Sequence, residues 1–126
     1  MPLFVKVGGG DKCLQTLSDT LYELVAHDKL ISGLYGKSGT TMDPNFFYRY
    51  IMHIVGRKPY DPCQIREAQA KLGFREKHFT QFMKLLGEAL GMLSIKDEVI
   101  CEILKVALTT RADLKGETMK EGVTYW

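Results

Sequence analysis

Histidine and cysteine are the side chains of this chain best suited to bind a metal or to act as nucleophiles, and there are few of either. The histidines are His27, His53 and His78, and the cysteines are Cys13, Cys63 and Cys101. The cysteines are odd in number, widely spaced and lack a C-x-x-C pair. This pattern indicates free thiols in a reducing compartment and argues against a disulfide scaffold or a zinc site. No paired carboxylates, Ser/His arrangement or Gly-rich phosphate loop indicates hydrolysis or group transfer.

These residues must be positioned by helices, because apolar residues recur every three or four positions along the chain. Asp43-Pro44 and Asp61-Pro62 each combine an N-cap acid with proline at the first helical position. The pattern predicts about five helices and no strand. Their expected ranges are 11–25 with Asp11 as N-cap, 43–55, 63–72, 76–90 ending at Gly91, and a last helix up to Leu114 that a capping box at Ser94–Asp97 begins. A further short helical piece is expected at 29–35.

Composition indicates one soluble domain, which we place at residues 1–116, followed by a tail at 117–126. Of the 126 residues, 45% are hydrophobic and 25% are charged, enough to build a core without disulfides. The net charge of +2 comes from interspersed Lys, Arg, Asp and Glu, so we expect no nucleic-acid partner. No apolar run approaches the roughly 20 residues of a membrane span, and no secretory signal is recognisable. The expected location is therefore intracellular, in the cytoplasm or a mitochondrion.

Three stretches carry a resemblance to a known family. They are Leu3-Phe4-Val5-Lys6-Val7-Gly8-Gly9, Thr20-Leu21-Tyr22-Glu23-Leu24-Val25, and the run from Tyr60-Asp61-Pro62-Cys63 to Gly73-Phe74. In order and spacing they resemble the group I truncated globins, and the likeness extends from about Leu3 to Gly116. The resemblance implies an all-α fold, the two-over-two helical sandwich. In that fold haem lies between a distal helix, here 43–55, and a proximal helix, here 63–72.

The chain departs from this family at the haem iron. Gln69 stands where the resemblance places the proximal histidine, and an amide is a poor ligand for porphyrin iron. On the distal side Phe46 and Phe47 could fill the space of the cofactor, with Tyr50 beside them on the same helix. Tyr22 matches the distal tyrosine of the family, and Tyr35 falls near a phenylalanine that packs on the haem face.

Other residues could in principle replace the lost ligand. His78 begins the helix after the proximal one, and its alternative role is at the surface or at the helix start. His53 could face inward from the distal helix or lie toward solvent. Cys63 begins the proximal helix, where the helix dipole lowers the pKa of a thiol, but its position two turns from Gln69 directs it away from a haem centre. Cys13 and Cys101 are expected to be partly buried helix residues.

The favoured interpretation is a degenerate truncated globin without haem or metal. It would serve as a structural or interaction subunit of a larger assembly, possibly an organellar one, rather than as an enzyme. Tyr125 and Trp126 would suit a partner anchor, since both residue types are enriched at interfaces. The alternative is a haem protein of unusual ligation that binds oxygen or nitric oxide, with oxidation of nitric oxide as a conceivable activity. A third possibility is another apolar ligand in the vacated pocket.

Overall fold

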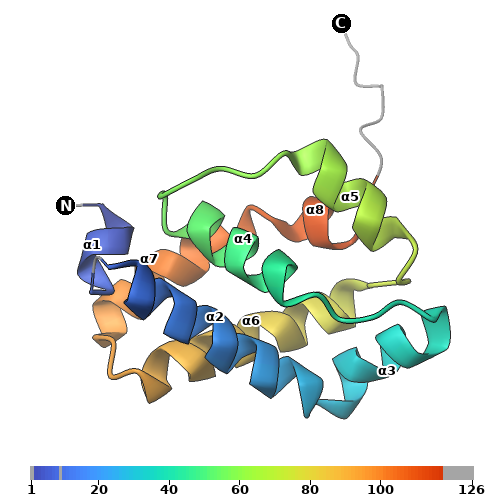
Figure 1. Cartoon of the computed structure of the whole chain (residues 1–126), viewed down its shortest axis with the longest axis horizontal. Coiled ribbons are helices and arrows are strands. Elements are labelled where there is room, and N and C mark those ends of the chain that lie inside the picture. The colour runs from blue at the N-terminus through green and yellow to red at the C-terminus, as the bar shows by residue number, and fades with distance from the viewer. Residues whose placement is uncertain (1, 9, 118–126) are drawn as a thin grey trace, which may run out of the picture.

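A computed structural model describes residues 2–8 and 10–117, and all of its regular elements are helices (Figure 1). The all-α prediction is therefore confirmed, although the described residues form more helices than the five expected. The helices are α1 (Leu3–Lys6), α2 (Asp11–Ala26), α3 (Lys29–Ser38), α4 (Pro44–Ile54), α5 (Pro62–Ala70), α6 (Glu76–Met92), α7 (Asp97–Leu108) and α8 (Arg111–Leu114).

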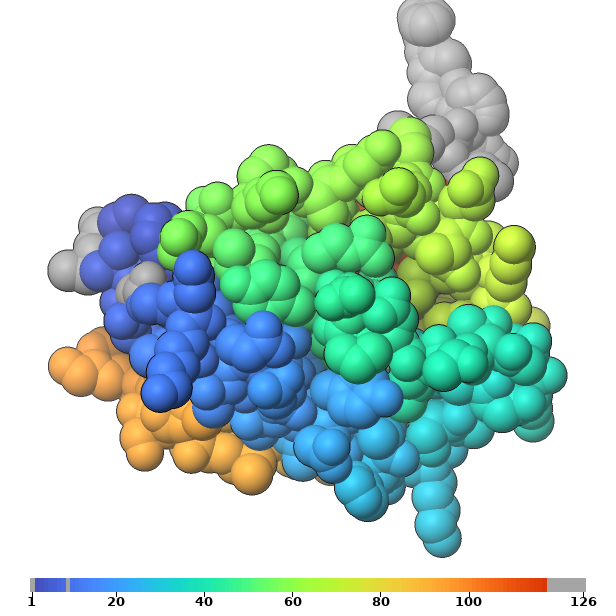
Figure 2. Space-filling view, viewed as in Figure 1, coloured from blue at the N-terminus to red at the C-terminus, as the bar shows by residue number. Residues whose placement is uncertain are grey.

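The helices pack as a sandwich around one continuous core. α2 lies across α4 and α6, α6 packs against α7, and the short α8 packs against α5 (Figure 1). The packed face of α2 matches the predicted periodicity, since Leu14, Leu17, Leu21 and Val25 are all buried. Figure 2 shows α2 and α4 side by side on the visible face. In the same view α3 lies at the lower right and α5 at the upper right. This arrangement is consistent with the truncated-globin sandwich.

Both predicted Asp-Pro helix starts are present. The Asp43 carboxylate accepts a hydrogen bond from the backbone N–H of Asn45 at 3.0 Å, and that of Asp61 accepts from Cys63 N–H at 3.0 Å. Because the first N–H groups of a helix have no partner within it, each cap satisfies one of them. These caps fix where α4 and α5, the two helices that carry the candidate site, begin.

Four local expectations are wrong. Gly91 does not end α6, which continues to Met92. The box at Ser94–Asp97 does not form, because Ser94 adopts a left-handed φ of 61° in the turn and Lys96 is the N-cap of α7. Gly10 rather than Asp11 is the N-cap of α2. The last predicted helix is split, since α7 ends at Leu108 and α8 starts at Arg111.

The three cysteines are free thiols, as expected, but Cys13 and Cys101 are exposed rather than partly buried. Cys13 packs against the turn between α1 and α2. A Cβ atom added at Gly8, whose φ is 116°, would lie 2.8 Å from the Cys13 sulfur. This turn therefore needs glycine for both its torsion and its space. In the described part of the chain, no helix has the length and apolar content needed to cross a membrane.

Candidate functional site

Gln69 lies near the end of α5 with 5% of its surface exposed. Its side-chain Nε2 donates a hydrogen bond to the backbone carbonyl of Leu114, the last residue of α8, at 2.9 Å. The carbonyls at the end of a helix have no hydrogen-bond donors within that helix. Gln69, on another helix, therefore supplies a donor to the last carbonyl of α8. In this structure the side chain at the expected proximal position joins α5 to α8.

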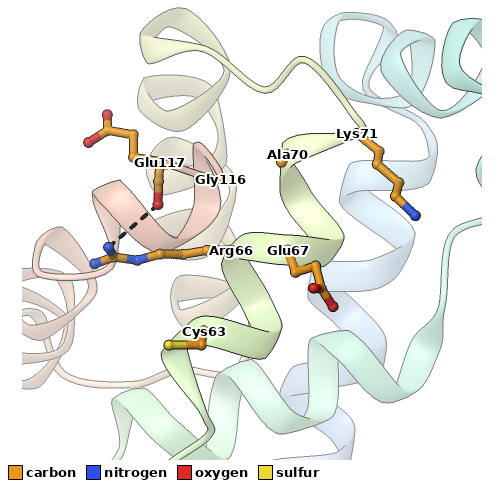
Figure 3. Close-up of a pocket in the computed structure, with 7 residues that line it drawn as sticks. All are labelled: Cys63, Arg66, Glu67, Ala70, Lys71, Gly116 and Glu117. Carbon is orange, nitrogen blue, oxygen red and sulfur yellow. Dashed lines mark hydrogen bonds between the residues drawn. The ribbon is translucent and has the colours of Figure 1, made fainter. Parts of the chain in front are cut away.

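The segment after α8 approaches α5 closely enough to need glycine at residue 116. Gly116 has a φ of 66°, and a Cβ atom added there would lie 2.4 Å from the backbone nitrogen of Ala70. Figure 3 shows Gly116 and Glu117 across a surface groove from the side chains along α5, with an Arg66 N–H donating to the Glu117 carbonyl at 3.5 Å. The groove has a volume of about 460 Å³. The C-terminal part of the described chain thus covers one side of the helix that carries Gln69.

On α4, the predicted distal aromatic residues form one packed group in the core. The Phe47 ring meets Tyr22 edge-on at 5.3 Å between centroids, and Phe46 meets Phe47 at 5.5 Å. Tyr50 is fully buried and contacts the Phe82 ring of α6 at 5.3 Å. Such edge-to-face contacts add to the free energy gained by burying each ring. The structure places these side chains against one another in the interior.

Tyr50 also has a buried polar partner, Thr110, whose Oγ1 lies 2.9 Å from the tyrosine hydroxyl. The Thr110 hydroxyl donates its own hydrogen to the Ala107 carbonyl at 2.6 Å, so Tyr50 must be the donor to Thr110. Burial raises the pKa of Tyr50, and this bond partly opposes the shift. Tyr50 therefore remains protonated and acts as a fixed donor between α4 and the α7–α8 turn.

Tyr35 of α3 lies near Tyr22, and both side chains are half-buried. Burial, with a smaller contribution from the Tyr22 hydroxyl, raises the pKa of Tyr35 to about 12. The Tyr35 hydroxyl therefore stays protonated and can donate a hydrogen bond, and the structure places it near Tyr22.

The two histidines proposed as replacement ligands each accept a backbone hydrogen bond. Nδ1 of His78 accepts from the Arg75 N–H at 2.9 Å, and Nδ1 of His53 accepts from the Tyr60 N–H at 3.2 Å. A neutral ring that accepts at Nδ1 carries its proton on Nε2, which leaves no free lone pair for a metal. Burial lowers the pKa of both rings, so both remain neutral near pH 7.

The structure gives positions for the two histidines and for Cys63, the third residue considered as a replacement ligand. His78 has the helix-start role, because it caps the beginning of α6, but it is buried rather than at the surface. His53 lies partly in solvent and stacks on the Tyr60 ring at 3.8 Å between centroids. Cys63 is exposed at the start of α5 and lines the groove of Figure 3. Tyr125 and Trp126 lie outside the described residues.

Sequence reasoning missed a buried polar network centred on Asp113 in α8. Its carboxylate accepts from the Tyr60 hydroxyl at 2.6 Å and from Arg66 Nε at 2.8 Å. Burial and this contact with Asp113 raise the pKa of Tyr60. A signal existed in the sequence, because Asp113 follows Thr110 by three residues and so continues the buried face of the preceding helix.

These side chains do not fit a haem iron. Gln69 offers a weakly coordinating amide whose nitrogen is engaged with Leu114, and His53 and His78 use their basic Nδ1 atoms to accept backbone N–H groups. An axial bond from either histidine would require its Nδ1 hydrogen bond to break, and Gln69 could offer iron only its amide oxygen, a weak ligand.

Comparison with known proteins gives two relatives of similar length. The chain is 24% identical over 114 residues to the group 1 truncated hemoglobin GlbN of Nostoc sp. (strain MUN 8820) and 23% identical over 114 residues to that of Nostoc commune. Each match covers 90% of this chain and 93% of the relative. No family model matches the chain. The shared stretch includes the helices that carry the aromatic group and Gln69.

Proposed function

We propose that this chain, which is similar to group 1 truncated hemoglobins over 90% of its length, is a haem-free truncated globin whose role is to contact other proteins in a larger assembly. The relatives are named as hemoglobins, and a haem iron in a globin is held by one strong protein bond. The proposal is that this chain gave up that bond and kept the fold.

The observation that carries the proposal is the hydrogen bond from Gln69 to the Leu114 carbonyl. It gives the residue at the proximal position a structural partner inside the protein. Turning the Gln69 side chain away from α8 toward an iron would leave the buried carbonyl without this donor, at a cost of about 1–3 kcal/mol, and would offer iron only a weak amide-oxygen ligand in return. The arrangement therefore favours the haem-free state.

The surface of α7 supports a role in protein contact. The buried face of this helix is formed by Val99, Ile103 and Ala107. A second apolar row on the same helix comprises Ile100 and Leu104, which are half-buried, and Leu108, which is 47% exposed. These residues are four positions apart and so lie on one side of the helix. The row begins at the edge of the core, on which Ile100 and Leu104 pack, and ends in the exposed Leu108, where an apolar surface is open to a partner protein.

A haemin titration of the apo-protein, followed at the Soret band, tests the haem-free part of the proposal. We expect no saturable band for the wild type and the same result for Gln69→Ala, which removes the amide. A band that saturates at one equivalent of haemin in the wild type would overturn the proposal. It would favour the alternative, a haem protein of unusual ligation, and Gln69→Ala, His53→Asn and His78→Asn would then identify the ligand.

Native electrophoresis of extracts from the cells that express the chain tests the partner contact. The chain alone has a mass of 14.3 kDa, and we expect it to migrate in a much larger species. A Leu108→Glu variant, which changes the exposed end of the row, should release it, whereas Lys84→Glu, on the exposed side of α6, should leave it assembled. Migration of the wild type as a monomer would contradict the proposed role.

A further inference from the structure

A second candidate site lies on the outer side of α4, away from the core face that carries Phe47 and Tyr50. It is a pocket of about 290 Å³ between the second half of α4 and the connector to α5. In Figure 1 this connector runs along the upper edge of the molecule, and Figure 2 shows it at the surface above α4. The pocket is lined by Tyr48, Arg49, Met52, Lys58, Pro59 and Tyr60.

The walls of this pocket are held in place by bonds that need no ligand. The Tyr60 ring is fixed by stacking on His53 and by its hydroxyl bond to Asp113. The carbonyl of Met52 accepts from the backbone N–H groups of both Arg57 and Lys58, at 2.9 and 3.1 Å. A preformed wall lowers the entropy cost of binding, because little must be ordered when a ligand enters.

The pocket combines apolar walls with positive charge. Tyr48, Met52, Pro59 and Tyr60 supply the apolar surface, and Arg49 and Lys58 are the only charged lining residues. Arg49 Nε donates to the Asn45 carbonyl at 3.4 Å. Within the described ranges 2–8 and 10–117, no ion pair is found for Arg49 or Lys58. Both cations are therefore available to an incoming anion.

The acids of the neighbouring backbone are already engaged. Asp61, next to Tyr60 in the chain, caps α5, and Asp113 is shared between Tyr60 and the Arg66 guanidinium. No carboxylate lines the pocket itself. A ligand with one negative charge would supply the counter-charge that Arg49 and Lys58 lack. Its apolar part would cover the tyrosine rings and the Met52 thioether that line the pocket.

We propose that this pocket binds a small organic acid, with one carboxylate on an apolar body the size of a benzene ring. The volume of about 290 Å³ lies at the lower limit of ligand pockets and suits a body of this size. The carboxylate accepts hydrogen bonds from Lys58 and Arg49, and the apolar body packs on Tyr48, Met52 and Tyr60. This site is separate from Gln69 and does not depend on whether the chain holds haem.

Phenylacetate and its neutral amide, phenylacetamide, test the proposal by titration followed by two-dimensional NMR of the full chain. The two probes have the same apolar body and differ in charge. We expect phenylacetate to bind saturably at one site, with the largest amide shifts in residues 48–60, and phenylacetamide to bind at least about tenfold more weakly, since bonds to a charged group are lost. Equal affinity of the two probes, or shifts spread over the surface, would overturn the proposal.

A charge-neutralised variant gives an independent readout. Arg49→Gln with Lys58→Gln should weaken phenylacetate binding about tenfold or more while the spectrum stays folded. The matched control, Lys84→Gln with Lys105→Gln, removes the same charge from exposed positions on α6 and α7 and should leave the affinity unchanged. An equal loss in both variants would mean attraction by net charge alone, and it would rule out a site at this pocket.

Discussion

Gln69 and Leu114 are 45 residues apart in the chain, and the side-chain amide of the first donates to the main-chain carbonyl of the second at 2.9 Å. One hydrogen bond thus joins the end of α5 to the end of α8. The same contact brings Gly116 against the backbone of Ala70. The position at which the family resemblance places an iron ligand is here part of the attachment of the C-terminal helix.

Replacing Gln69 by leucine should therefore destabilise the fold even though the volume is similar. The Leu114 carbonyl would lose its buried donor, and we expect the free energy of unfolding to fall by about 1–3 kcal/mol. Urea denaturation followed by circular dichroism measures it. Gln15→Leu is the control, since Gln15 bonds to Asp19 on the exposed side of α2 and should change stability by less than about 0.5 kcal/mol. Equal effects would contradict the structural role of Gln69.

Gly116→Ala should be more harmful than Gly39→Ala. Both glycines have left-handed torsions, with φ of 66° and 73°, so both variants pay about 1 kcal/mol for the backbone. A Cβ atom at residue 116 would in addition collide with Ala70, whereas nothing lies within 4 Å of one at residue 39. The difference in midpoint between the two variants in thermal unfolding reports this collision. Identical midpoints would mean that α8 does not pack this closely on α5.

Asp113→Asn should destabilise the protein by about 2–3 kcal/mol. It leaves Arg66 without its carboxylate, and the loss is smaller than the 3–5 kcal/mol of a fully buried pair because 21% of the Arg66 side chain is exposed. Glu76→Gln is the matched control, because its ion pairs with Arg111 and Lys115 are exposed and contribute about 0–1 kcal/mol. Denaturant unfolding of both variants at pH 7 measures the two losses in the free energy of unfolding. A loss for Asp113→Asn no greater than that for Glu76→Gln would contradict the stabilising role of the Asp113 network.

Stability should fall as the solution is acidified below about pH 6.5. The pKa of His78 is lowered in the folded protein, chiefly by burial and then by Lys77 and Arg75, whereas the unfolded chain titrates near 6.5. Between these two pKa values the unfolded chain holds a proton that the folded protein lacks. The histidine's contribution is therefore complete above pH 6.5 and is lost as the pH falls toward the folded pKa.

Urea unfolding between pH 7.5 and pH 5 measures this dependence. His78→Asn keeps an acceptor near the position of Nδ1 and removes the titrating group, so its stability should depend less on pH. His53, whose pKa is lowered for the same main reason, adds to the slope, and the double variant with His53→Asn should be the flattest. A double variant with the slope of the wild type would assign the pH dependence to other groups.

Local sequence signals predicted the helix starts well where the signal was a side chain bonding its own backbone. Asp43 and Asp61 cap α4 and α5 as expected, because an N-cap needs only the first turn of its own helix. Gly91 was misread as a helix end, since glycine lowers helix propensity by only about 1 kcal/mol and α6 continues through it. Ser94 also differs from its predicted role as the first residue of a capping box. Its left-handed torsion forms the turn into α7, and Lys96 is the N-cap of that helix.

The sequence by itself determined the helical class and the apolar faces, because both depend on residue type and on spacing within a few turns. The prediction that Gln69 stands where the family has its proximal histidine came from the resemblance and stays a prediction. Only the tertiary structure decided what Gln69, Asp113 and the ring nitrogens of His53 and His78 bond to. Gln69 and Asp113 find partners about 45 residues away, which become neighbours only after α8 packs on α5. The donor and acceptor atoms of a side chain follow from its residue type. Which partners those atoms bond to depends on which groups packing buries beside them, away from water.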